Sequence, residues 1–140
     1  KLRTGSLLPL LGEQSLLAVD YTRMHQTHEA GDLISKYALN YLRDKFTVRF
    51  DHQICKNLTA GWYFRYQKRM GTYEKYVNKE KVGDEAYPAF STLDLKLNYT
   101  FKDMVFNLDL NNLYDTHYFD LGSIPQPGFW LSAGVVYRLK

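Results

Sequence analysis

The sequence predicts an all-β fold, built as an antiparallel up-and-down sheet, and three observations support this class. Six segments alternate apolar and polar residues with a period of two, which is the pattern of half-buried strands. Short and long connections alternate between these segments. Aromatic residues make up 16% of the chain, and such side chains favour places where a dry region meets a wet one.

The six segments follow one another along the chain. The first runs from Ser15 to His25 and has Leu17, Val19 and Tyr21 on its apolar side. The other five cover residues 46–54, 58–67, 93–102, 104–111 and 129–140. Residues 34–43 are open to two interpretations, a short helix or the upper part of the second strand.

Tight turns and longer polar links alternate between the strands. The tight turns are expected at residues 9–14, 54–57 and 102–103, and the long links at 26–35, 69–88 and 114–127. Alternate connections of an up-and-down sheet lie at the same end, so all short turns would share one end. Outer-membrane barrels have this asymmetry, with short periplasmic turns and long external loops.

The alternation alone does not decide which face meets water. In a soluble barrel the apolar face points inward, whereas in a membrane barrel it meets lipid and the polar face lines the lumen. The apolar faces carry no charge in mid-strand, and strands of roughly 9 to 12 residues have the length of a tilted crossing. Aromatic residues also gather near the strand ends, at Tyr21, Tyr66, Phe101, Phe129 and Tyr137. We therefore predict a membrane barrel.

Composition excludes several classes of function. The net charge of +3 is too small and too dispersed for a nucleic-acid partner. The single cysteine, Cys55, allows neither an intrachain disulfide nor a thiolate metal cluster. No run approaches the 18 apolar residues of a transmembrane helix. Neither a Ser/His/Asp grouping nor a Gly-rich phosphate loop is found, so we expect no enzymatic activity and no cofactor.

Two groups of polar residues could suggest chemistry. His25 and His28 lie three apart, but in extended or loop backbone this spacing does not bring the rings together, so we predict no metal site. The alternation places three carboxylates on the polar face beside three basic residues. We expect crossed charge pairs along a lumen wall from Asp20, Asp94, Asp109, Arg49, Arg65 and Lys96.

The C-terminal stretch NLYDTHYFDLGSIPQPGFWLSAGVVYRL resembles the signature of TonB-dependent outer-membrane receptors. In that family Asn-Leu-Phe/Tyr-Asp ends the penultimate strand, a Tyr-rich loop with Pro-Gly follows, and the last strand alternates apolar residues. The residues that carry the match are Asn112, Leu113, Tyr114, Asp115, Tyr118, Pro127 and Gly128. Upstream, YLRDKFTVRFDHQI is similar to the family's start of a long strand, with Asp44 where proline is common. The stretches GDLISKYALNYLRDK and IPQPGFW look most like the cobalamin-receptor branch found in Bacteroidetes.

The resemblance implies a 22-stranded barrel around an N-terminal plug, located in the bacterial outer membrane. Residues 1–140 would supply about the last six strands, so we expect a piece of a longer receptor without its plug domain and TonB box. The implied ligand is cobalamin, otherwise an iron-siderophore. The implied partners are outer-membrane lipid, the rest of the barrel and plug, the TonB complex and the barrel-assembly machinery. The family usually ends on Phe, whereas this chain ends Leu139-Lys140.

Ligand contact would come from the long links, because binding residues concentrate on the variable loops of a rigid scaffold. The link 69–88 offers Tyr73 and Tyr76, and the link 114–127 offers Tyr118 and Gln126. Two other functions stay open at this point: a soluble lipocalin-like carrier of an apolar ligand, and a small complete outer-membrane barrel of structural or adhesive role. The latter needs at least eight strands.

Overall fold

The computed structural model describes residues 2–3, 15–25, 42–120 and 124–139, and every element within these ranges is a β-strand. The strands are β1 (Leu2–Arg3), β2 (Leu16–Arg23), β3 (Leu42–Cys55), β4 (Leu58–Arg69), β5 (Thr72–Val77), β6 (Glu80–Ala86), β7 (Phe90–Phe101), β8 (Met104–Asn111), β9 (Phe119–Asp120), β10 (Ile124–Pro125) and β11 (Trp130–Tyr137). Within the described ranges, no helix has the length and hydropathy to cross a membrane.

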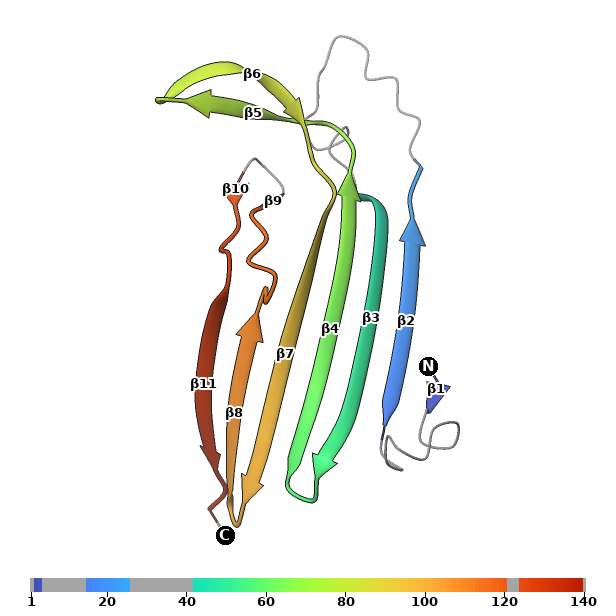
Figure 1. Cartoon of the computed structure of the whole chain (residues 1–140), viewed down its shortest axis with the longest axis vertical. Coiled ribbons are helices and arrows are strands. Elements are labelled where there is room, and N and C mark those ends of the chain that lie inside the picture. Colours follow the sequence, from blue (N-terminus) through green and yellow to red (C-terminus); the bar gives the residue numbers. More distant parts are fainter. Residues whose placement is uncertain (1, 4–14, 26–41, 121–123, 140) are drawn as a thin grey trace.

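Seven strands form one antiparallel sheet in the order β1-β2-β3-β4-β7-β8-β11 (Figure 1). The strands β5 and β6 form a separate hairpin, and so do β9 and β10. The six alternating segments of the sequence correspond to β2, β3, β4, β7, β8 and β11. The prediction of an all-β, antiparallel up-and-down sheet is therefore confirmed.

The two ends of the sheet differ as the connections predicted. The turns after β3 and β7 lie at one end, and both small hairpins lie at the other (Figure 1). Lys102 makes the second turn possible with a left-handed φ of 54°. We call these the turn end and the loop end. The turn expected at residues 9–14 lies outside the described ranges, as does most of the ambiguous segment, although Leu42 and Arg43 belong to β3.

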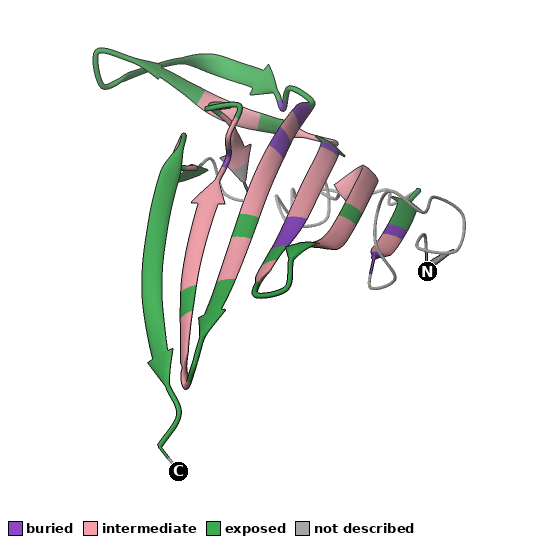
Figure 2. Cartoon of the chain, turned by 60° about the horizontal axis from the view of Figure 1, so that its bottom comes forward, coloured by how far each residue is buried: buried purple, intermediate pink, exposed green. Residues whose placement is uncertain are grey.

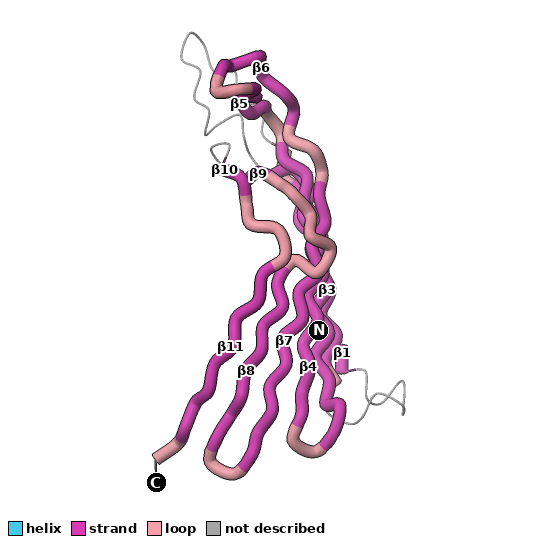
Figure 3. The backbone as a smooth tube through the Cα atoms, turned by 60° about the vertical axis from the view of Figure 1, so that its left-hand side comes forward, coloured by secondary structure: helices cyan, strands magenta, loops and turns pink. Residues whose placement is uncertain are grey.

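The long link expected at residues 69–88 is present between β4 and β7, but it contains two strands that the sequence analysis did not predict. It forms the β5–β6 hairpin, which projects beyond the sheet (Figure 3). The hairpin turns on Asn78 and Lys79, whose φ angles of 51° and 71° are both left-handed. Two such residues in succession are typical of a type I′ turn, and the usual sequence signal is Asn-Gly or Asp-Gly. Lys79 replaces that glycine, so the signal is missing from the sequence.

The strand register brings the apolar residues of all six long strands onto one face. One row across the sheet pairs Val19 with Val48, Val48 with Phe64, and Phe64 with Leu93. A second row, nearer the turn end, consists of Ala60, Leu97, Leu108 and Ala133. The opposite face carries the polar residues. The sheet therefore has two continuous faces of opposite character.

No second layer covers the apolar face within the described ranges (Figure 3). Of the four buried hydrophobic residues in these ranges, only Ala60 belongs to the apolar face, and the strands are mostly half-exposed or exposed (Figure 2). Val19, Leu131 and Val135 keep 56%, 59% and 58% of their surface exposed. Burying such a side chain is worth about 1.5–3 kcal/mol, so this face would be stabilised strongly by another apolar phase.

Candidate ligand-binding site

The hollows of the sheet lie on its polar face. One, of about 490 Å³, is lined by residues of β3, β4 and β7 that include Arg49, Tyr63 and Lys96. A second, of about 250 Å³, lies where strands meet the segment that leads into β11. We call it the loop-end hollow, and its lining residues are Arg65, Thr92, Asp94, Asn111, Asn112, Tyr118, Gln126, Pro127 and Trp130.

Arg65 on β4 is the fixed cation of the loop-end hollow. Its Nη2 donates to the hydroxyl of Tyr118 at 3.0 Å, and its Nε donates to Oγ1 of Thr92 at 3.3 Å. The guanidinium also lies 5.6 Å from the ring centres of both Tyr118 and Phe90. These two rings are stacked, with centres 4.1 Å apart. Hydrogen bonds and ring faces together hold the planar cation in one orientation.

Asn112 fixes the segment between β8 and β11. It is only 4% exposed and has a left-handed φ of 53°, which asparagine tolerates better than most residues. Its Nδ2 donates to the carbonyls of Thr116 at 2.9 Å and Pro127 at 3.3 Å, and its Oδ1 accepts from the Thr116 amide at 3.1 Å. Its own amide donates to Asp94 at 2.7 Å. One side chain thus joins both ends of the segment.

Asp115 makes the second connection in this segment. Its Oδ1 accepts a hydrogen bond from the amide of Phe129 at 2.8 Å. The same carboxylate lies against Gly128, where a Cβ atom would collide with it. Glycine at position 128 therefore allows a close approach of the two parts of the chain. Together, Asn112 and Asp115 explain physically why this stretch needs its Asn, Asp and Gly.

The lining of the loop-end hollow contains one buried polar atom whose hydrogen bonding is incomplete. The Nδ2 of Asn111 is buried and has no hydrogen-bond partner among the described residues. Asn111 lines the loop-end hollow, and Trp130 is its direct neighbour in the sheet. A buried donor without a partner is unfavourable by about 1–3 kcal/mol, so a ligand or water that accepts from Asn111 would be favoured here.

The structure brings two of the four predicted ligand residues together. Tyr118 and Gln126 both line the loop-end hollow, and the Gln126 amide donates to the Tyr118 carbonyl at 2.9 Å. Tyr73 is adjacent, because its ring stacks on Phe119 with centres 4.6 Å apart. Tyr76 lies apart from them: it is 56% exposed and its hydroxyl donates within its own hairpin, to a glutamate two positions earlier.

The charged groups of the β5–β6 hairpin perturb one another. Lys75 and Tyr73 both donate to the carboxylate of Glu85, which lowers the pKa of Glu85. The hydrogen bond that Tyr73 donates to Glu85 raises the pKa of Tyr73. The hydrogen bond that Lys75 donates to Glu85 likewise raises the pKa of Lys75. The ring of Tyr73 also packs against the ring of the buried Tyr87, with ring centres 5.5 Å apart. Tyr73 therefore connects the hairpin to the aromatic residues beside the loop-end hollow.

Sequence reasoning missed Phe90, Thr92, Asn111 and Trp130 as parts of the site. The signal that could have found Thr92 is the strand register, since it is the direct partner of Arg65. The expected wall of crossed charges is confirmed at one pair, in which Lys96 Nζ lies 3.5 Å from Asp109 Oδ1. At Arg49 the expectation was wrong, because this side chain pairs along its own strand with Asp51 at 2.6 Å.

Of the two histidines considered for a metal site, His25 is described by the structure, whereas His28 lies outside the described ranges. Within those ranges, no group of three or more His, Cys, Asp or Glu residues is placed to hold a metal ion. Comparison with known proteins found no matching family model, curated protein or solved structure.

Proposed function

We propose that this chain is part of an outer-membrane β-barrel receptor that imports a scarce, bulky ligand. In this proposal lipid covers the apolar face of the sheet, and the polar face lines the lumen. The observation that carries the proposal is the register, which joins six strands into one mainly apolar face and one hollowed polar face.

The height of the apolar face supports this assignment. On β4 it extends from Leu58 to Tyr66, which is about 26 Å along the strand at a rise of about 3.3 Å per residue. At a tilt of about 40° this corresponds to roughly 20 Å across the membrane, close to the apolar band of about 25 Å in outer-membrane barrels.

Aromatic side chains border the apolar face at both ends. Tyr21, which is 61% exposed, marks the loop end, and Tyr99 and Tyr137 mark the turn end. Near the turn end, His52 accepts a hydrogen bond from Trp62 Nε1 at 3.3 Å, so the imidazole on this face has a partner. Amphipathic rings at two levels are typical of the two membrane interfaces.

A soluble lipocalin-like carrier accounts less well for the same sheet. Such a carrier places its apolar face inward, around an apolar ligand. Here the hollows are on the other face, and charged or amide side chains line them, among them Arg49, Lys96 and Asp94. This observation favours the receptor over the carrier.

The loop-end hollow supports a ligand that has both hydrogen-bonding groups and a flat body. Arg65 offers a fixed cation, Asn111 offers a donor without a partner, and Tyr118 and Trp130 offer ring faces. Cobalamin carries peripheral amides on a flat ring system and matches these properties, and a ferric siderophore is the second candidate. The preference for cobalamin follows the sequence resemblance.

Uptake by cells that express the whole receptor to which this chain is proposed to belong tests the proposal. We expect labelled cobalamin, or otherwise a labelled ferric siderophore, to bind and to enter, and entry but not binding to stop when a protonophore collapses the proton gradient. Tyr118→Ala should lower the affinity of binding about tenfold, since a buried aromatic contact is worth 1–2 kcal/mol or more. Tyr114→Ala is the matched control, because Tyr114 is 55% exposed in the same segment and does not line the hollow.

The outcomes separate the competing functions. Uptake of neither ligand by cells whose outer membrane contains the protein would favour a small barrel of structural or adhesive role. Recovery of the protein in the soluble fraction without detergent would contradict both membrane functions and favour the carrier.

A further inference from the structure

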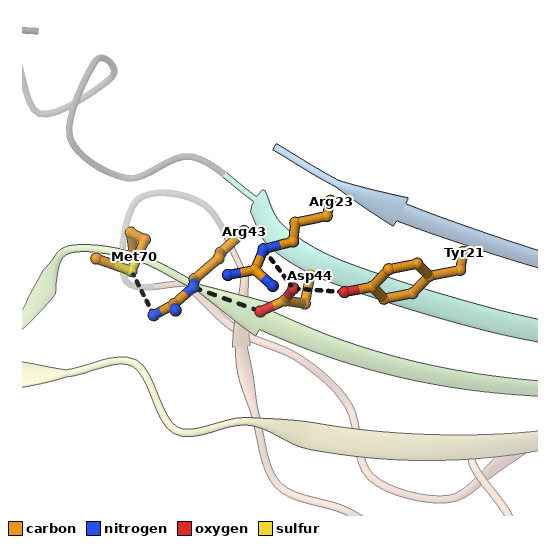
Figure 4. A network of polar contacts seen from close by, with 5 residues as sticks. All are labelled: Tyr21, Arg23, Arg43, Asp44 and Met70. Carbon is orange, nitrogen blue, oxygen red and sulfur yellow. Dashed lines mark hydrogen bonds and ion pairs between the residues drawn. The ribbon is translucent and has the colours of Figure 1, made fainter. Parts of the chain in front are cut away.

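A cluster of charged side chains lies at the loop end of β2 and β3, around the carboxylate of Asp44 (Figure 4). The hydroxyl of Tyr21 donates to Asp44 Oδ1 at 2.9 Å. Arg23 Nε lies 3.8 Å from Oδ1, and Arg43 Nε lies 3.5 Å from Oδ2. Lys68 on β4 is the direct neighbour of Asp44 in the sheet. We call Arg23, Arg43, Asp44 and Lys68 the β2–β3 cluster.

The register places this cluster on the apolar side of the sheet, immediately beyond its apolar rows. Arg23 follows Tyr21 by two positions on β2, and Lys68 follows Tyr66 by two positions on β4. Two residues of a strand correspond to about 7 Å. If the apolar face spans the hydrocarbon, as the proposed function requires, the cluster lies at the level of the lipid headgroups in the outer leaflet.

A β-bulge brings the second arginine into the cluster. Leu42 pairs with Arg69 and Asp44 pairs with Lys68, so Arg43 is the extra residue between them. Bulges re-aim side chains at strand ends. Arg43 is turned toward Asp44, and its Nη1 also donates to Met70 Sδ at 3.7 Å.

The cluster has an excess of positive charge on its exposed side. Two arginine side chains lie against the Asp44 carboxylate, and Lys68 is paired with Asp44 across the sheet, which leaves two formal positive charges among these residues. The Asp44 side chain is 18% exposed, whereas Arg23 is 62% exposed. The carboxylate thus lies beneath and orients the guanidinium groups above it. Guanidinium groups match the oxygens of phosphate, and basic pockets at the membrane interface bind anionic headgroups.

We propose that the β2–β3 cluster binds the phosphate group of a lipid headgroup in the outer leaflet of the membrane. Arg23 and Lys68 contact the phosphate oxygens, and Arg43 with Asp44 holds Arg23 in position. The ring of Tyr21, which precedes Arg23 by two positions on β2, packs at the boundary between the headgroup and the acyl chains. This inference rests on the proposed membrane location, but it is independent of which ligand the receptor imports.

The test measures phosphorylated lipid that stays bound when the protein is extracted from outer membranes in mild detergent, by phosphorus analysis and mass spectrometry. The double variant R23Q/K68Q should retain about 25-fold less than the parent, because each of the two basic residues at an anionic surface contributes on the order of fivefold. K56Q/K102Q, which removes two charges at the turn end, should retain the parent amount within about twofold. R23K/K68R keeps both charges and should retain most of the bound lipid.

Three results would overturn the proposal. The first is equal lipid retention by R23Q/K68Q and K56Q/K102Q. The second is loss of lipid from R23K/K68R as complete as from R23Q/K68Q, which would assign the effect to the fold. The third is complete displacement of the lipid by excess inorganic phosphate, which would assign the site to free phosphate. If the parent protein stays in the outer membrane while one of these results is obtained, only this inference fails; a parent protein that is soluble removes the proposed function as well.

Discussion

Asn112→Ala is the substitution whose effect the structure defines best. It removes three side-chain hydrogen bonds, two to the backbone of Thr116 and one to the carbonyl of Pro127. At about 1 kcal/mol for each neutral hydrogen bond, this loss destabilises the folded state by about 3 kcal/mol. The left-handed φ of 53° adds about 1 kcal/mol for alanine. We expect the free energy of unfolding to fall by about 4 kcal/mol in total.

Asn112→Gly separates the two contributions. Glycine accepts the left-handed backbone but makes none of the side-chain hydrogen bonds, so it should lose about 3 kcal/mol and not 4. Asn107→Ala, on the polar face of β8, is the control and should change stability by less than about 0.5 kcal/mol. The assay is equilibrium urea unfolding in detergent micelles, followed by the fluorescence of Trp62 and Trp130.

The reasoning about Asn112 would be refuted by either of two results. If both substitutions stay within about 0.5 kcal/mol of the parent, the hydrogen bonds do not hold the segment between β8 and β11. If the glycine variant is as stable as the parent and the alanine variant is not, backbone strain alone explains the position.

Two further perturbations test other parts of the structure. Gly128→Ala puts a Cβ against the carboxylate of Asp115 and should lower the free energy of unfolding by about 2 kcal/mol. Gly134→Ala is the control and should be nearly neutral, because a Cβ at position 134 meets open space. Equal effects of the two substitutions would contradict the close approach of Gly128 and Asp115. The lowered pKa of Glu85, caused first by the hydrogen bond from Lys75, means that its contribution to the β5–β6 hairpin is complete above the ordinary glutamate pKa and is lost as pH falls through the lowered value. Hydrogen exchange corrected for intrinsic rates should show less protection of this hairpin in acid, and Glu85→Gln should remove that dependence; the same acid loss in the glutamine variant would contradict the assignment.

The alternation of side chains was sufficient to predict the six long strands and their two faces. This succeeded because a period of two assigns each residue to a face without knowledge of its partners. The β5–β6 hairpin was missed because its turn uses Asn78 and Lys79 at left-handed angles without glycine. Lysine rarely adopts a left-handed angle, so the residue type at position 79 gave no signal of a turn.

The loop-end hollow could be predicted only in part. Loop tyrosines were expected to matter, and Tyr118 lies in the hollow. Its position depends, however, on the stacking against Phe90, which is distant in sequence, and on the hydrogen bonds of Asn112. The neighbours Arg65 and Thr92 meet only through the strand register. Such contacts between distant residues carry no local sequence signal.

The most direct test of the proposed membrane location of the sheet is a scan of residues 93–98 on β7. Cysteine is placed at each position in the Cys55→Ser background, labelled with a fluorophore, and studied in bilayers. We predict a strict alternation: brominated lipid quenches labels at Leu93, Leu95 and Leu97, and aqueous iodide quenches labels at positions 94, 96 and 98. Labels at the apolar positions that brominated lipid does not quench, or a pattern without a period of two, would contradict it.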